Sequence, residues 1–219
     1  MAKIHHTTLK PTKLELLTEW LPARPWYRGG AATPVLAKSG GFRLDDPEGE
    51  VGIEFLVATD TSGAEPVAYL VPMTYRAAPL AGAEDALVGT LEHGVLGKRW
   101  VYDGCHDPVL ISELFALIEG RAPAVAQSIS DTLDPEVVRS YRGGPRRLDG
   151  LTPEPVDDEE GTRLSTPDGA VLHIHRVLRP VAGLRAAPPE DAVGHVARHW
   201  QNPDGAEVAA VFLTLTSRP

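Results

Sequence analysis

The 219-residue chain has a single cysteine, five lysines and one asparagine, and it has no long apolar run. One cysteine excludes an intramolecular disulfide and a zinc site built from cysteine alone. No segment approaches the roughly 20 apolar residues that a membrane-spanning helix needs. The first ten residues also lack the apolar stretch of a signal peptide. We therefore expect a cytoplasmic protein without a membrane partner.

Positive charge is scarce as well. The chain has 21 Lys and Arg against 30 Asp and Glu, which gives a formal net charge of −9. A nucleic-acid-binding protein needs clustered basic residues that meet phosphates, so no nucleic-acid partner is expected. Hydrophobic residues make up 42% of the chain, which is typical of globular proteins, and the 21 glycines and 20 prolines predict many turns.

Apolar periodicity predicts the elements of the first half. Leu14, Leu17 and Leu21 recur at helical spacing, and two prolines after them end that helix. Residues 34–76 predict a β-meander, because apolar residues alternate with others in two runs separated by turn residues. A short strand is expected over 99–102. A helix is expected over 107–119, because Asp107 suits the N-cap and the proline after it suits the first turn.

The second half predicts two hairpins with Asp-Gly turns, one pairing 162–165 with 170–178 and the other pairing 195–201 with 207–216. We therefore expect an α+β fold in two parts. Residues 1–120 form an antiparallel β-meander with packed helices, and residues 121–219 form a second antiparallel β-rich lobe. A loop at about 133–162, rich in proline, glycine and acidic residues, separates them.

Four short segments carry a resemblance to a known family. The chain reads Trp-Leu-Pro at 20–22 and Arg-Pro-Trp-Tyr at 24–27, then Tyr-Leu-Val-Pro at 69–72 and Trp-Val-Tyr-Asp at 100–103. Over residues 5–120 it resembles the N-terminal cap of bacterial maltokinases. These enzymes look like aminoglycoside phosphotransferases with an added cap, and they use ATP and Mg²⁺ to phosphorylate maltose for glucan synthesis. The resemblance also implies that 121–219 is like a kinase N-lobe.

The resemblance places His173 where such kinases have a phosphate-contacting lysine. No lysine follows Lys98, and Asn202 lies in a predicted turn rather than a catalytic loop. No glycine-rich phosphate loop and no catalytic lobe are found. We therefore expect a non-catalytic cap-like protein without a cofactor, with a binding or regulatory role linked to sugar or glucan metabolism. Its partner would be a protein or a small-molecule ligand. The alternative is an accessory subunit of, or an incomplete, ATP- and Mg²⁺-dependent sugar kinase.

Candidate ligand-binding residues lie at two places. Tyr27 and Arg28 precede two glycines and could contact a sugar, whereas Trp26 beside them is expected to pack in the core. His173 and His175 lie two apart on a predicted strand, so they share one face. With a third histidine from the last hairpin, His195 or His199, they could form a metal-dependent enzyme site. The competing interpretation is a solvated sheet face.

The segment Asp103-Gly104-Cys105-His106-Asp107 has the densest set of metal-ligating residue types. It is better explained as the turn between a strand and the helix that Asp107 caps. Cys105 lacks a base from a distant segment and is not expected to be a nucleophile. The adjacent histidines at 5 and 6 would point to opposite faces of a strand, so we expect an exposed polar start to the chain.

Overall fold

The computed structural model describes residues 8–127, 132–144, 152–202 and 204–217, which form mainly antiparallel β-structure. The first sheet has six strands in the order β1-β5-β6-β4-β3-β2. Their bounds are β1 (Leu9–Lys10), β2 (Leu36–Asp45), β3 (Gly52–Asp60), β4 (Val67–Arg76), β5 (Leu87–His93) and β6 (Gly97–Asp103). The expected β-meander over 34–76 is confirmed as β2, β3 and β4, each antiparallel to the next.

The second sheet follows the order β7-β12-β13-β10-β9-β8, and β11 also pairs with β13. The bounds are β7 (Val137–Tyr141), β8 (Val156–Asp157), β9 (Gly161–Ser165), β10 (Val171–His175), β11 (Val181–Ala182), β12 (Ala192–Gln201) and β13 (Glu207–Thr216). Both predicted hairpins are confirmed as β9–β10 and β12–β13, because Asp-Gly turns between alternating runs set their register.

Helix α1 (Lys13–Trp20) begins at a capping box, in which Thr12 and Glu15 satisfy each other's backbone N–H groups. Helix α2 (Pro108–Glu119) has the expected Asp107 N-cap and ends at Gly120 in the left-handed conformation. Three short 3₁₀ turns complete the set: η1 (Leu21–Ala23), η2 (Glu84–Ala86) and η3 (Gly104–His106). Within the described ranges, no helix combines the length and the apolar character that spanning a membrane requires.

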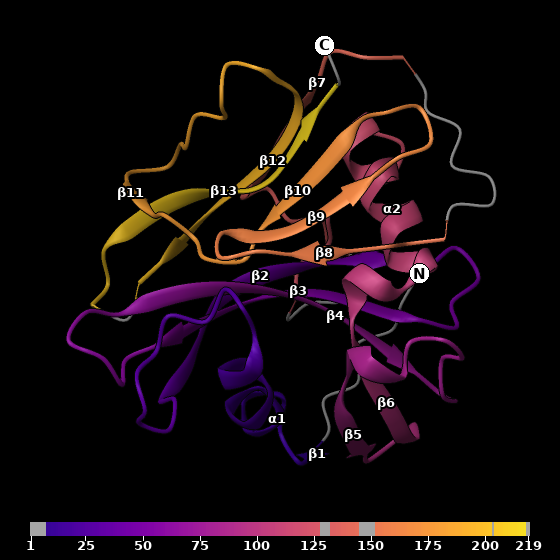
Figure 1. Cartoon of the computed structure of the whole chain (residues 1–219), viewed down its shortest axis with the longest axis vertical. Helices are drawn as coiled ribbons and strands as arrows, with labels where there is room; N and C mark the ends of the chain where they lie inside the picture. Colours follow the sequence, from indigo (N-terminus) through magenta and orange to yellow (C-terminus); the bar gives the residue numbers. More distant parts are fainter. Residues whose placement is uncertain (1–7, 128–131, 145–151, 203, 218–219) are drawn as a thin grey trace.

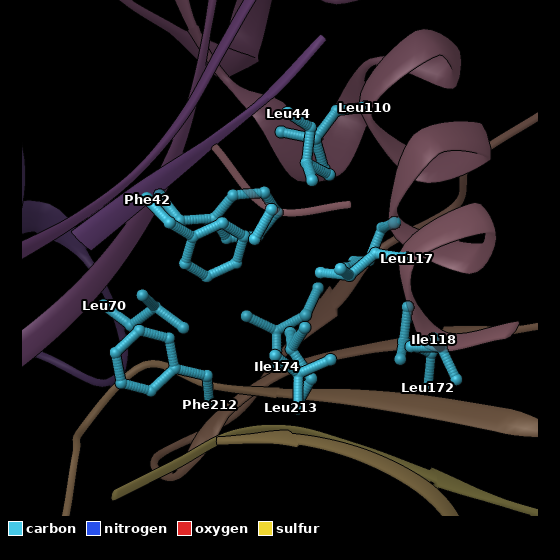
Figure 2. Packing of buried hydrophobic residues seen from close by; sticks show 14 of the residues in the cluster. Phe42, Leu44, Leu70, Leu110, Leu117, Ile118, Leu172, Ile174, Phe212 and Leu213 are labelled. Carbon is cyan, nitrogen blue, oxygen red and sulfur yellow. The ribbon is translucent and has the colours of Figure 1, made fainter. Parts of the chain in front are cut away.

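The two sheets face each other across one apolar core (Figure 1). Phe42 and Leu70 from the first sheet lie opposite Phe212 and Ile174 from the second, and α2 closes the space with Leu117 and neighbouring residues (Figure 2). Phe42 stacks on Phe55 with ring centroids 4.6 Å apart. This cluster contains residues from both sides of the boundary expected at residue 120, so the two parts share their core.

The outer face of the first sheet has its own apolar cluster under α1. Leu17, Leu21 and Trp26 are fully buried there against β3 and β4. The first sheet is therefore covered on both faces, by α1 on one side and by the second sheet on the other.

Strands β5, β7, β8 and β11 lie where the sequence pattern did not predict them. Strand β5 was missed because Gly89 interrupts its apolar alternation; a Cβ at this position would lie 2.7 Å from Leu16 of α1. Strands β7 and β8 lie inside the span 133–162, which was expected to be a loop. Both are short edge strands, and their pairing with β12 and β9 stabilises them more than their own sequence does.

The chain passes from one sheet to the other directly after β10. The Leu70 N–H donates to the carbonyl of Arg176 at 2.9 Å, and the Leu178 N–H donates to the carbonyl of Ala68 at 2.9 Å. Residues 176–178 thus pair with residues 68–70 of β4 and lie beside that strand in the first sheet. The hairpin predicted to continue to residue 178 therefore ends at His175.

Arg176 lies at this crossing, and its side chain is completely buried. Its Nη2 donates to both carboxylate oxygens of Asp103, at 2.7 and 2.6 Å, and its Nε donates to Thr162 at 2.7 Å. The guanidinium also lies over the ring of Trp26, 5.2 Å from the centroid. Asp157 accepts from Thr162 at 2.6 Å and from the Trp26 indole at 3.3 Å. One cation thus links β6, β9 and the segment after α1.

Removing this cation should destabilise the whole fold. Arg176→Ala leaves the buried Asp103 carboxylate without its counterion, so we expect a loss of about 3–5 kcal/mol in the free energy of unfolding. Urea denaturation measures it. Arg179→Ala is the matched control, because Arg179 pairs with Glu160 on the surface and its loss should cost about 0–1 kcal/mol. Equal effects of the two substitutions would contradict the role assigned to Arg176.

Candidate functional site

The turn after η1 contains Trp26, Tyr27 and Arg28, and these side chains make contacts within the chain itself. Trp26 is fully buried, so it packs in the core as expected. Tyr27 stacks near Tyr69, with ring centroids 5.6 Å apart, and its hydroxyl donates to Asp60 at 3.0 Å. Burial and this carboxylate raise the pKa of Tyr27 to about 12. Its hydroxyl is therefore a fixed donor inside the chain.

Arg28 meets the acidic turn that precedes β9. Its Nη2 pairs with Glu160 at 2.8 Å, and Glu160 also pairs with Arg179 at 2.5 Å. The charge of Glu160 acts on His173 and His175 as well. Of the four predicted ligand-binding residues, the structure thus pairs Arg28 with this carboxylate, whereas Tyr27 points to Asp60. The Arg28–Glu160 pair is a surface contact between the first part of the chain and the acidic turn.

His173 and His175 lie on the outer face of the second sheet, with ring centroids 4.3 Å apart. His175 Nε2 lies 3.2 Å from the Thr214 hydroxyl, whereas the buried Nε2 of His173 has no partner among the described residues. Burial, His173 and Arg179 lower the pKa of His175 to about 4. Burial and then Arg163 lower the pKa of His173. Both rings are therefore neutral at pH 7.

The third histidine needed for a metal site is not supplied. His195 and His173 both pair with Thr214, from opposite sides of β13, and His195 bonds instead to Ser140 at 2.7 Å. His199 faces Glu207. In the described part of the chain, no group of three or more His, Cys, Asp or Glu side chains could hold a metal ion. The histidines at 5 and 6 lie outside the described residues.

The 103–107 segment has a structural role, as we predicted when we interpreted it as a turn. Asp103 holds Arg176, and Asp107 caps α2 while both of its oxygens accept from Arg76 at 2.7 Å. Cys105 is fully buried, and burial raises the pKa of its thiol well above the ordinary value. Both carboxylates are committed to internal ion pairs, so neither is open to a metal or a substrate.

A pocket with a mixed polar and apolar lining, at which no candidate residue was predicted, opens at the seam between the two sheets. Its volume is about 480 Å³, within the range of small-molecule sites. One wall is residues 38–41 of β2, and the other consists of 126–127, 132–136 and Arg198 of β12. The bulge of β2 between Lys38 and Gly40 shapes the first wall. Gly41, at φ +129°, brings the backbone against Gln127, which a Cβ would meet at 2.6 Å.

Charged side chains line this seam pocket. Arg198, which is nearly buried, pairs with Asp134 at 3.1 Å and with Glu136. Gln127 donates to Glu54 at 3.0 Å, and Lys38 stands exposed on the opposite wall. The only sequence signal for this site was the pair of adjacent glycines inside a predicted strand, which is typical of a bulge or a close approach.

The neutral histidines make stability depend on pH. The pKa of His175 is about 4 in the folded chain and about 6.5 when unfolded, so the unfolded state binds more protons between these values. Stability is therefore fully present above pH 6.5 and falls as the pH drops towards 4, by about 1–3 kcal/mol. Urea unfolding at a series of pH values measures the loss, and His175→Gln should reduce it. An unchanged pH dependence in that variant would contradict this account.

Comparison with known proteins supports the assignment of the first sheet. Residues 20–107 match the family model of the maltokinase N-terminal cap domain. The match runs from Trp20, at the end of α1, to Asp107, which caps α2, so it includes β2 to β6. No curated protein gives a significant match to the chain. The resemblance seen in the sequence is thereby confirmed over residues 20–107, which are similar to the maltokinase N-terminal cap domain.

Proposed function

We propose that this chain is a non-catalytic binding protein of maltose or glucan metabolism that holds a small-molecule ligand in the seam pocket. The cap domain provides the link to maltokinases. The observation that carries the proposal is the pocket itself, because its volume of about 480 Å³ and the charged side chains in its lining suit a small polar metabolite. Its walls come from β2 of the cap-like region and from the segment before β7 together with Arg198 of β12, so a ligand would contact both parts of the chain.

The surroundings of His173 support a role without phosphoryl transfer. In this proposal the second sheet takes the place of a kinase N-lobe sheet, and His173 takes the place of the phosphate-contacting lysine. Its lowered pKa leaves it neutral at pH 7, and its Nε2 is buried. A neutral ring offers no charge to a nucleotide phosphate, whereas phosphoryl transfer depends on charge neutralisation. The chain would act in the bacterial cytoplasm. There it would bind a protein partner of the same metabolism according to whether its ligand is bound.

A labelling experiment tests the binding function. Cys105 is the only cysteine and is buried, so a cysteine introduced at the surface can be alkylated selectively. Leu133→Cys places a bulky maleimide adduct at the pocket, where Leu133 is 63% exposed. Val95→Cys, on the turn between β5 and β6, is the matched control. Thermal-shift assays of both adducts with maltose, trehalose, glucosamine, Mg-ADP and Mg-ATP provide the readout.

We expect at least one sugar to raise the melting temperature by several degrees at about 100 times its Kd. The adduct at Leu133→Cys should abolish this shift, and the adduct at Val95→Cys should leave it intact. A flat screen, or a shift that survives the adduct in the pocket, would contradict the proposal. A shift with Mg-ATP would favour the alternative, a subunit of an ATP-dependent sugar kinase.

A further inference from the structure

The two sheets end in four edge strands, and three of these are protected against further pairing. Strands β1 and β8 have only two residues each. Strand β2 has the bulge between Lys38 and Gly40, and further along it Arg43 pairs with Val125. Short strands, bulges and covering segments are common ways in which a protein keeps a sheet edge from pairing with another chain. The fourth edge strand, β7, has none of these in the described part of the chain.

Strand β7 is a continuous edge of five residues, which pair with β12 without a bulge. The Arg142 N–H donates to the Val193 carbonyl at 2.8 Å. In this register the backbones of Ser140 and Val138 also face β12, whereas the N–H and C=O of Arg139 point away from it. Among the described residues, no strand pairs with that outer side of β7. An extended segment of another chain can therefore add there as a further strand.

This edge carries positive charge in a chain whose formal net charge is −9. Arg139 and Arg142 are both exposed, and neither forms an ion pair within the described residues. The Arg139 guanidinium lies beside Gly120 at the end of α2, where a Cβ would collide with it. Arg142 follows three positions later, so it points to the other face of the sheet, and its Nη2 donates to the Ala192 carbonyl at 2.8 Å. The two arginines thus restrict the edge to a strand that brings negative charge.

A second copy of this chain does not meet that requirement. Pairing β7 with itself would gather Arg139 and Arg142 from both copies along one short edge. No carboxylate of β7 would accompany them, because the strand reads Val-Val-Arg-Ser-Tyr. Like charges brought together across a strand pair are destabilising. The charge of the edge therefore favours an acidic partner over self-association.

We propose that β7 is a docking edge for an extended acidic segment of a partner protein, which adds to the second sheet as a further strand. The segment pairs with the backbone of Arg139, and two of its carboxylates, three residues apart, pair with Arg139 and Arg142. Positions three apart on a strand face opposite sides of the sheet, as the two arginines do. An apolar residue of the segment lies against Val138, which is 50% exposed. Docking here needs no ligand in the seam pocket, so the proposal goes beyond the proposed function.

Fluorescence anisotropy with two labelled peptides tests the role of charge. The acidic probe is Thr-Val-Glu-Val-Thr-Glu-Val, and the matched probe has lysine in place of both glutamates. Arg139→Glu and Arg142→Glu reverse the charges of the edge. Lys98→Glu is the matched control, because β6 lies at the other end of the molecule from β7 (Figure 1). Each edge variant should raise the Kd of the acidic probe about tenfold, the control should leave it unchanged, and the lysine probe should bind the wild type at least about tenfold more weakly.

Two further variants separate strand addition from simple charge attraction. Arg139→Ala and Arg139→Pro both remove the guanidinium, but only proline also removes the N–H that points away from β12. We expect Arg139→Pro to bind the acidic probe about fivefold more weakly than Arg139→Ala, because one backbone hydrogen bond is lost. Thermal melts of the variants show that each is folded.

Four results would overturn the docking edge. They are the absence of binding by the acidic probe, binding that is indifferent to both charge reversals, equal Kd values for Arg139→Ala and Arg139→Pro, and a lysine probe that binds as tightly as the acidic one. Analytical ultracentrifugation of the wild type adds a fifth. A dimer that dissociates in Arg139→Pro would show that a second copy occupies the edge, and it would exclude the acidic partner.

Discussion

The ion pair between Arg176 and Asp103 is the constraint on which the rest of the structure depends. A guanidinium with no exposed surface is tolerated only where a carboxylate and further acceptors surround it, and here Asp103 and Thr162 supply them. These partners come from different sheets, so the charge can be satisfied only when both sheets are in place. The same residue starts the segment that leaves β10 and joins the edge of β4. The buried ion pair can therefore form only when the chain passes between the sheets at this place, and the ion pair in turn stabilises that arrangement.

The two sheets share one apolar core because the chain joins them at Arg176. The segment that matches the cap-domain family ends at the start of α2, but the inner face of its sheet is covered by β10, β12 and β13 of the same chain. The bulge of β2 lies directly against β12, where a Cβ on Gly40 would be 3.1 Å from Trp200. The seam pocket opens beside this contact.

Most of the regular elements could be predicted because their signals are local. The Asp107 N-cap, the left-handed Gly120 and the Asp-Gly turns each act within a few residues, and the structure has all of them. Strands β5, β7, β8 and β11 could not be predicted, because their apolar pattern is interrupted or short. They are stabilised by hydrogen bonds to strands distant in sequence, which no local pattern records.

The sequence by itself determined the resemblance to the cap family, the capped helices, the hairpin registers and the structural role of the 103–107 turn, because these depend on short-range chemistry. Only the tertiary structure decided where the charged groups meet. It joined Arg28 to Glu160, buried Arg176, and placed Lys38 across a pocket from Glu136. These pairs are separated by dozens of residues, so their meeting depends on sheet packing and on the cost of burying an unpaired charge.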